Sequence, residues 1–183
     1  MGTIKVHEFI ALDGVFEDPS WTAQWWPWDP AMGAAVGTLT SNASDILLGR
    51  KTFEMFAPAW SGRTADEDPG APFFNDSPKH VVTSADLAVQ WSNSTSLGTY
   101  DPDTIRDLKA RTAGDIYTSG SGQLVRALLA DGLVDELHLF VYPIVLGAGR
   151  RLWGDGGDAT TLALRASETY TNGIVHLVYG PAA

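Results

Sequence analysis

The apolar residues near the start of the chain alternate with more polar ones. Over residues 4–12 the apolar side chains recur with a period of two, and the turn-forming pair Asp13-Gly14 follows. This pattern predicts a first β-strand that ends at the turn. Near the other end, the pair Asn172-Gly173 separates two alternating runs, which predicts a terminal hairpin.

Helices are predicted between the strands. Asp101 is suited to cap a helix whose first position is Pro102. Residues 57–78 are dense in proline, glycine and aspartate and predict a long surface loop. The predicted strands cover residues 4–12, 45–48, 81–83, 116–118, 134–145, 162–171 and 174–179, and the predicted helices cover residues 31–39, 102–111 and 124–130, with a further helix beginning after residue 48.

Strands and helices alternate through the middle of the chain, and two antiparallel strands close its end. This order is typical of an α/β three-layer sandwich, with a mostly parallel central sheet, helices on both faces and an antiparallel C-terminal hairpin. The length of 183 residues fits a single domain, residues 1–183, that buries its own core.

The net charge of the chain limits the kinds of molecule that it can attract. Twelve Lys and Arg residues against 22 Asp and Glu residues give a formal net charge of −10. A chain this acidic has no attractive field for the phosphates of nucleic acids or for anionic lipids, so we expect neither nucleic acid nor membrane as a partner. Any anion must therefore be held by a local site.

Several kinds of chemistry are excluded by residue type. The chain has no cysteine, so thiolate nucleophiles and cysteine-bound metals are ruled out. The four histidines lie on different predicted strands without metal-ligand spacing, and we expect no metal site. Residues 137–146 are the most apolar stretch but are too short to cross a bilayer. The first residues lack the apolar run of a signal peptide, so we expect a cytoplasmic protein.

Two turns are candidates for binding phosphate, because each follows a predicted strand and opens a helix. Glycine lets a backbone approach a phosphate closely, a helix N-terminus offers free N–H groups, and Arg50 and Lys51 supply positive charge. Either turn alone could equally be a structural bend. The candidate residues are Gly49, Arg50, Lys51 and Thr52 in the first turn, and Gly120, Ser121, Gly122, Gln123 and Leu124 in the second.

Five longer sequence motifs are spread along the chain. They are FIALDGVFEDP at residues 9–19, LLGRKTFEMF at 47–56, KHVVTS at 79–84, YTSGSGQLVRALLADGLVDELHLFVYPIVLGAGRRLW at 117–153 and NGIVHLVY at 172–179. Together these motifs resemble the dihydrofolate reductase-like family that includes the C-terminal reductase domain of the bifunctional riboflavin-biosynthesis enzyme. The resemblance runs nearly from end to end and implies that family's fold, with NADPH as cofactor.

The resemblance also implies a role for each turn. An arginine beside a helix N-terminus agrees with a preference for NADP over NAD on physical grounds. The matching positions are Gly49, Arg50 and Thr52 for the 2′-phosphate and pyrophosphate, Thr83 and Ser84 near the adenosine ribose phosphate, and Gly120 to Leu124 over the pyrophosphate.

The substrate side rests on fewer matches. Asp13 matches an aspartate that the family keeps after its first strand, where nicotinamide and substrate meet. A carboxylate there could orient a ring N–H or relay a proton; alternatively it is a turn aspartate paired with its own backbone. The chain departs from the family in two places. No acid lies near Gly33, where dihydrofolate reductases place their proton-directing carboxylate, since the nearest is Asp29. Ser119 stands where riboflavin reductases usually carry glutamate.

Four tryptophans crowd the segment after the first strand. They could form a stacking lid over a flat heterocycle, a hydrophobic plug, or a contact between two copies of the chain. We carry them as candidate substrate-binding residues. They are Trp21, Trp25, Trp26 and Trp28.

These observations favour an NADPH-dependent reductase that transfers a hydride to a small flat heterocycle or carbonyl compound, similar to 5-amino-6-(5-phosphoribosylamino)uracil reductase. The alternatives are a nucleotide-binding protein of the same fold that has lost turnover, a reductase of unrelated small molecules, and an enzyme of the dihydrofolate reductase type. The apolar stretch from Leu137 to Trp153 further predicts a homodimer, unless the protein's own helices cover it.

Overall fold

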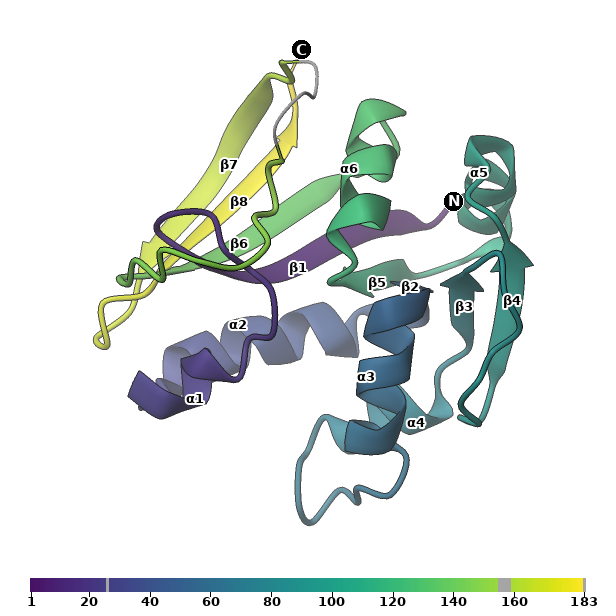
Figure 1. Ribbon diagram of the computed structural model, residues 1–183, viewed down its shortest axis with the longest axis horizontal. Helices are drawn as coiled ribbons and strands as arrows, with labels where there is room; N and C mark the ends of the chain where they lie inside the picture. Colours follow the sequence, from purple (N-terminus) through teal and green to yellow (C-terminus); the bar gives the residue numbers. More distant parts are fainter. Residues whose placement is uncertain (26, 155–158, 183) are drawn as a thin grey trace.

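A computed structural model describes residues 1–25, 27–154 and 159–182, with the backbone alone at Trp25. It contains the strands and helices expected of an α/β chain, and the order of these elements is shown in Figure 1. The strands are β1 (Thr3–Ala11), β2 (Ala43–Gly49), β3 (Lys79–Val82), β4 (Ser94–Gly98), β5 (Asp115–Ser119), β6 (Glu136–Tyr142), β7 (Leu162–Thr169) and β8 (Val175–Pro181), and the helices are α1 (Trp21–Trp25), α2 (Pro30–Ser41), α3 (Arg50–Trp60), α4 (Ala71–Asp76), α5 (Pro102–Arg111) and α6 (Gly122–Ala130).

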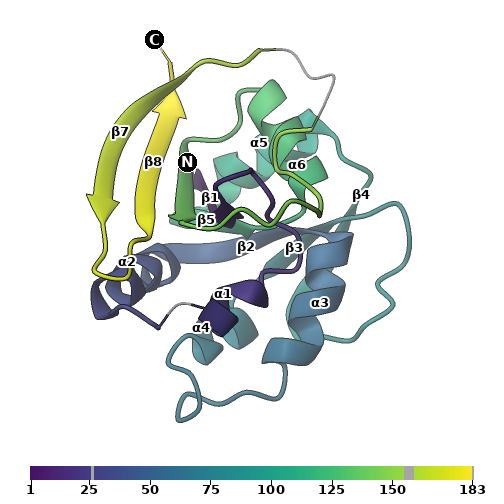
Figure 2. The ribbon, with the colours of Figure 1, turned by 60° about the vertical axis from the view of Figure 1, so that its left-hand side comes forward.

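All strands belong to one sheet in the order β4-β3-β2-β5-β1-β6-β8-β7. Neighbours from β4 to β6 run parallel, whereas β8 runs antiparallel to both β6 and β7. Figure 2 shows the β7–β8 hairpin at one edge of the sheet, apart from α5 and α6. The first strand of the chain is therefore a central strand, enclosed by β5 and β6.

The helices form two layers around the sheet. Helices α1 to α4 supply the core on one face, where Met32, Phe53 and Phe74 are buried. Helices α5 and α6 supply the other core, where Ile105 and Leu128 are buried. The three-layer α/β sandwich with an antiparallel C-terminal hairpin is confirmed. Within the described residues, no helix is long and apolar enough to cross a membrane.

Local signals account for several boundaries. The carboxylate of Asp101 accepts hydrogen bonds from the N–H groups of Asp103 and Thr104 at 3.3 and 3.2 Å, and α5 begins at Pro102 as predicted. Strand β6 ends at Tyr142, short of the predicted end at residue 145, because Pro143 has no N–H to continue a ladder.

The predicted loop over residues 57–78 is wrong in part. Helix α3 continues to Trp60, and α4 follows within the same segment. This short helix is stabilised from outside: Phe74 is buried, and the Nζ of Lys79 donates to the carbonyls of Phe74 and Ser77 at 2.7 and 2.8 Å. Helix α1 and strand β4 were also not predicted.

The apolar stretch from Leu137 to Trp153 divides into two parts. Its strand portion lies inside the sheet, where Leu137 and Phe140 are fully buried in the protein's own cores. Val145 and Trp153, beyond the strand, are exposed. The strand therefore needs no second copy to cover it. The homodimer stays a prediction, to be tested by light scattering.

Candidate functional site

The two predicted phosphate turns lie against each other at the carboxyl ends of β2 and β5. The hydroxyls of Thr52 and Ser121 are 2.9 Å apart. A Cβ added at Gly49 would lie 2.3 Å from the Oγ of Ser121, and one added at Gly120 would lie 2.8 Å from the Oγ1 of Thr52. Only glycine at these two positions leaves room for the turns to approach each other this closely.

The backbone of both turns is suited to an anion. Neither the N-terminus of α3, at Gly49, nor that of α6, at Ser121, has a side-chain cap. Gly120 and Ser121 both have a left-handed conformation, with φ of +64° and +58°, which is uncommon for a serine. Two adjacent helix N-termini with free N–H groups form a recognised kind of anion-binding concavity.

Two cations stand beside this concavity. Arg50 is exposed, and among the described residues its one ion pair is with Glu54 in the next turn of α3, at 3.1 Å. Lys51 is exposed as well, and its positive charge helps to lower the pKa of Glu17. An exposed pair within one helix is weak, so Arg50 is available to a phosphate.

The remaining candidate cofactor residues are placed less uniformly. Thr83 is buried after β3 and its hydroxyl contacts the backbone of Ala85 at 3.1 Å, whereas Ser84 is exposed. Gln123 is exposed on α6, but Leu124 points into the core. Leu124 can therefore serve a ligand only through its backbone.

Asp13 follows β1 and is held by a distant segment. Its Oδ2 accepts a hydrogen bond from the N–H of Gly147 at 2.8 Å, and Nη2 of Arg151 lies 3.8 Å away. The Gly147 N–H, with Arg151 contributing, lowers the pKa of the carboxyl below its usual value. Its Oδ1 is buried and has no hydrogen-bond partner in the described chain. Asp13 is thus an ionised, oriented carboxylate whose proton-relay role stays a prediction.

The tryptophans take different positions. Trp21 is buried with its ring edge-on to Tyr142, at a centroid distance of 5.2 Å, which matches the plug alternative. Trp28 is 62% exposed and lies over Gly33, where an added Cβ would sit 2.6 Å from the indole nitrogen. The side chain of Trp25 and the whole of Trp26 lie outside the described residues.

Asp29 has a structural position. It caps α2 by accepting from the N–H groups of Ala31 and Met32, and it also accepts from the backbone and hydroxyl of Thr171. These bonds hold the pKa of Asp29 low. Its carboxylate is therefore occupied in joining α2 to the terminal hairpin.

The sequence interpretation overlooked one buried acid, Glu8. It lies on β1, is 4% exposed and points to the face covered by α6, beneath Gly120. The signal was present, because Glu8 occupies an apolar phase of the alternation between Val6 and Ile10. A glutamate is rarely buried this completely unless its carboxyl group is paired.

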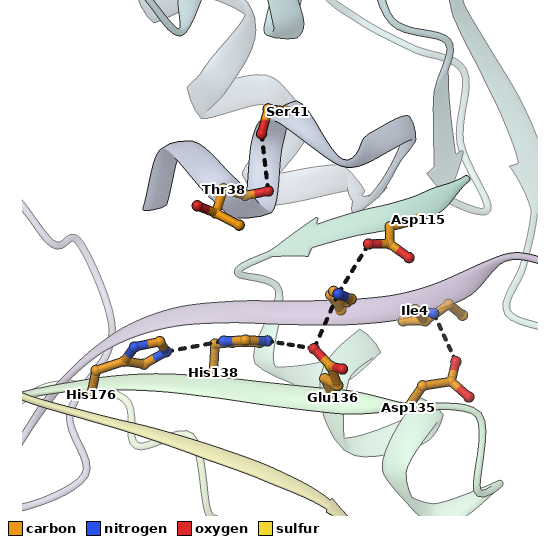
Figure 3. A network of polar contacts seen from close by, with 9 residues as sticks. Ile4, Thr38, Ser41, Asp115, Asp135, Glu136, His138 and His176 are labelled. Carbon is orange, nitrogen blue, oxygen red and sulfur yellow. Dashed lines mark hydrogen bonds and ion pairs between the residues drawn. The ribbon is translucent and has the colours of Figure 1, made fainter. Parts of the chain in front are cut away.

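A second polar cluster lies on the opposite face of the sheet, and Figure 3 shows its connections. His138 contacts both His176 and Glu136 at 3.0 Å, and Glu136 continues to Lys5 at 3.2 Å. Lys5 in turn pairs with Asp115 at 3.0 Å. A cavity of about 440 Å³ between α2 and the β7–β8 hairpin opens beside this histidine network. In the described part of the chain, no group of three or more histidines and carboxylates is arranged to hold a metal.

The chain is similar to known proteins in sequence and in fold. The chain is 25% identical to the uncharacterised protein YyaP of Bacillus subtilis (strain 168), over 93% of this chain and 90% of that protein. A provisionally assigned riboflavin biosynthesis protein from Shewanella sp. PV-4 superposes with a TM-score of 0.80 at 20% identity, over the whole of both chains. The riboflavin biosynthesis reductase Rib7 of Saccharomyces cerevisiae superposes with a TM-score of 0.64 at 13% identity, covering 99% of this chain and 90% of that one.

These two structures share the fold of the chain, at identities too low to carry more than that. The family match is broader, because residues 3–176 fit the RibD C-terminal domain. That span includes both glycine turns, Asp13 and all strands except β8, of which only Val175 and His176 are covered. The chain therefore belongs to the RibD C-terminal domain family.

Proposed function

We propose that this protein is an NADPH-dependent reductase. The observation that carries the proposal is the contact between the two glycine turns, which sets two uncapped helix N-termini side by side with Arg50 at their edge. A dinucleotide carries a pyrophosphate and, in NADPH, a further 2′-phosphate. Free N–H groups suit the first and a guanidinium suits the second.

The residues of the chain fit such a cofactor. Gly49 and Gly120 leave the backbone of both turns open to close approach, and Thr52 and Ser121 present hydroxyls between them. NADPH, when bound, supplies a hydride from its nicotinamide. The chain would bind and orient the cofactor, and Asp13 would hold or relay a proton at its carboxylate.

The substrate that we propose is a small flat heterocycle of the pyrimidine type, as the similarity of the fold to a pyrimidine reductase-like protein of Corynebacterium diphtheriae suggests, or a related carbonyl compound. Asp13 supports this choice, since a fixed carboxylate can accept from a ring N–H. Trp21 and Tyr142 pack edge-on near the end of β1, but both are buried and supply no open surface for a substrate ring.

Two observations favour a second candidate, a nucleotide-binding protein without turnover. Asp29, the acid nearest to Gly33, is fully engaged as a helix cap, and Ser119 replaces the glutamate usual in riboflavin reductases. No other acid in these positions could donate a proton.

The test has two stages. NADPH and NADH are titrated into the protein while tryptophan fluorescence is followed, and loss of NADPH absorbance is then measured across a panel of pyrimidines and carbonyl compounds. Tight NADPH binding with turnover that Asp13→Asn reduces by about 100-fold or more supports the reductase. Binding without turnover on any compound would favour the second candidate, and no binding would reject both.

A further inference from the structure

Glu8 lies directly beneath the second glycine turn. His7 pairs with Ser119 across β1 and β5, so that the next residue, Glu8, comes to the start of the turn. The N–H of Gly120 donates a hydrogen bond to the Glu8 carboxyl. One oxygen of this carboxyl, Oε1, is buried and has no hydrogen-bond partner in the described chain.

The surroundings of Glu8 are apolar and supply no opposite charge. It faces the core formed by Val6, Ile10 and Leu124, and its neighbour across β6 is Leu139. On the same face of the adjacent strand, the hydroxyl of Thr118 is also buried without a partner. A carboxyl in such a layer is stable mainly when it is uncharged.

The titratable groups on the packed elements do not change this. Arg126 on α6 lies beside the turn, since its Nη1 is 3.2 Å from a Cβ added at Gly122, but that Nη1 donates to the carbonyl of Leu152 at 2.9 Å. Tyr117 on β5 and His7 on β1 face the opposite side of the sheet and bond to each other at 2.7 Å. Burial raises the pKa of Glu8 to about 8, with only the Gly120 hydrogen bond opposing it.

We propose that Glu8 is a positioning residue for the cofactor turn and that it holds Gly120 to Gly122 in the binding conformation as an uncharged carboxylic acid. The inference rests on the proposed function, since it assigns the turn to a pyrophosphate. Ionisation of Glu8 places a negative charge under the N-terminus of α6, where the anion would bind. NADPH binding and ionisation of Glu8 therefore oppose each other.

The structure separates this role from simple packing. A leucine of similar volume would fit the apolar layer, but it could not accept the N–H of Gly120. Glutamine could accept that N–H and never ionises. The two substitutions therefore distinguish the hydrogen bond from the charge.

The experiment measures the dissociation constant of NADPH by tryptophan fluorescence from pH 6.5 to 9.5. The proteins are the wild type, Glu8→Gln, Glu8→Leu and the control Glu136→Gln, which makes the same chemical change in the histidine network on the other face. In the wild type and the control, we expect the dissociation constant to rise up to about tenfold per pH unit above pH 8, as one proton is lost. Glu8→Gln should bind as the wild type does at pH 7 and show no such rise. Glu8→Leu should bind more weakly at every pH.

The outcomes are distinct. A flat wild-type profile, or a Glu8→Gln profile that still rises, would overturn the positioning role while leaving the reductase proposal in place. Failure of the wild type to bind NADPH at any pH would reject both. Should Glu8→Gln not fold by circular dichroism, carbon-13 NMR of the wild-type glutamate carboxyls decides the matter. NADPH must then raise the pKa of Glu8, and an unchanged or lowered pKa contradicts the proposal.

Discussion

Consecutive residues of β1 enter two buried polar clusters that differ in how well their bonds are satisfied. His7 faces the side of the histidine network, where His138 bonds to both His176 and Glu136, and Tyr170 bonds to Glu168 at 3.0 Å. Glu8 faces the second glycine turn, where its own Oε1 and the hydroxyl of Thr118 have no partner in the described part of the chain. On the histidine side, Nε2 of His7 is buried without a hydrogen-bond partner among the residues that the structure describes.

The difference separates a structural network from a site. A buried polar group with partners stabilises one arrangement of the core, whereas an unpaired one costs about 1–3 kcal/mol and needs another explanation. Oδ1 of Asp13, just after the carboxyl end of the same strand, is a third buried oxygen without a partner in the described chain. The unpaired oxygens of Glu8 and Thr118 thus lie on the face beneath the second turn, that of Asp13 lies at the carboxyl end of β1, and the histidine network lies on the other face.

The largest expected effect is a pH dependence in which the two clusters act in opposite directions. Burial lowers the pKa of His7 to about 3 and that of His176 to about 4, so both remain neutral in the folded protein. Their contribution is fully present above their ordinary pKa of 6.5 and is lost as the pH falls. Together they should remove about 4 kcal/mol of unfolding free energy between pH 6.5 and 4.5.

Glu8 has the opposite sign. Its raised pKa means that the folded state retains a proton which the unfolded state loses above about pH 4.5, so stability increases as the pH falls from 8. Urea unfolding between pH 6.5 and 4.5 should show a shallow decline in the free energy of unfolding of the wild type. In Glu8→Gln the loss over the same interval should be about 2 kcal/mol larger, because the stabilising effect of Glu8 protonation is absent. Identical slopes for the two proteins would contradict the comparison.

A smaller effect is expected at Arg50. We predict that the protein prefers NADPH over NADH and that Arg50→Ala loses about 1.5–3 kcal/mol of NADPH binding, or about 10- to 150-fold in affinity. Stability should barely change, because the Arg50–Glu54 pair is exposed. Arg106→Ala is the matched control, since it removes an exposed arginine paired with Asp103 on α5. Equal affinity of the wild type for both cofactors refutes the assignment.

The smallest effect concerns the contact between the turns. Gly49→Ala brings a methyl group within 2.3 Å of the Oγ of Ser121, and we expect a loss of about 1–3 kcal/mol. Ser121→Gly removes that hydroxymethyl group and suits the left-handed backbone. The double variant should therefore recover most of the loss, as thermal unfolding can measure; additive losses would show that the turns are independent.

A related substitution is a less clean probe. Gly122→Val would remove space at the second turn and is expected to weaken NADPH binding. However, a Cβ at Gly122 would lie 2.5 Å from the ring of Phe16. The variant therefore disturbs the packing of the loop after β1 as well, and its effect on binding has to be compared with Phe16→Leu.

Sequence patterns predicted the elements that are determined locally. Helix α5 has its capping aspartate, its proline and its apolar face within twelve residues, and its bounds were correct. Strand β4, SerThrSerLeuGly in composition, is a polar edge strand without alternation. Helix α4 depends on Lys79 and the burial of Phe74. Both are stabilised by tertiary contacts that no local window contains.

The site was predictable to a similar depth. The glycine turns were identified from their own residues, but their mutual contact joins Gly49 to Ser121, which are far apart in the sequence. Asp13 was identified by its motif, whereas its partner Gly147 was not. Glu8 was overlooked because the alternation was read for its apolar members, and a single polar residue in that phase was passed over.

The central place of β1 has a consequence for synthesis. Lys5 pairs with Glu136 across β1 and β6, so the innermost strand of the sheet finds this neighbour 131 residues later in the chain. At translation rates of about 5–20 residues per second, β1 waits roughly 7–26 s for it. During that interval its buried side chains, Glu8 among them, are exposed on the nascent chain. Of the strands in this sheet, β1 is thus the first to be synthesised and among the last to be enclosed. We expect chaperones to act on the protein during this interval.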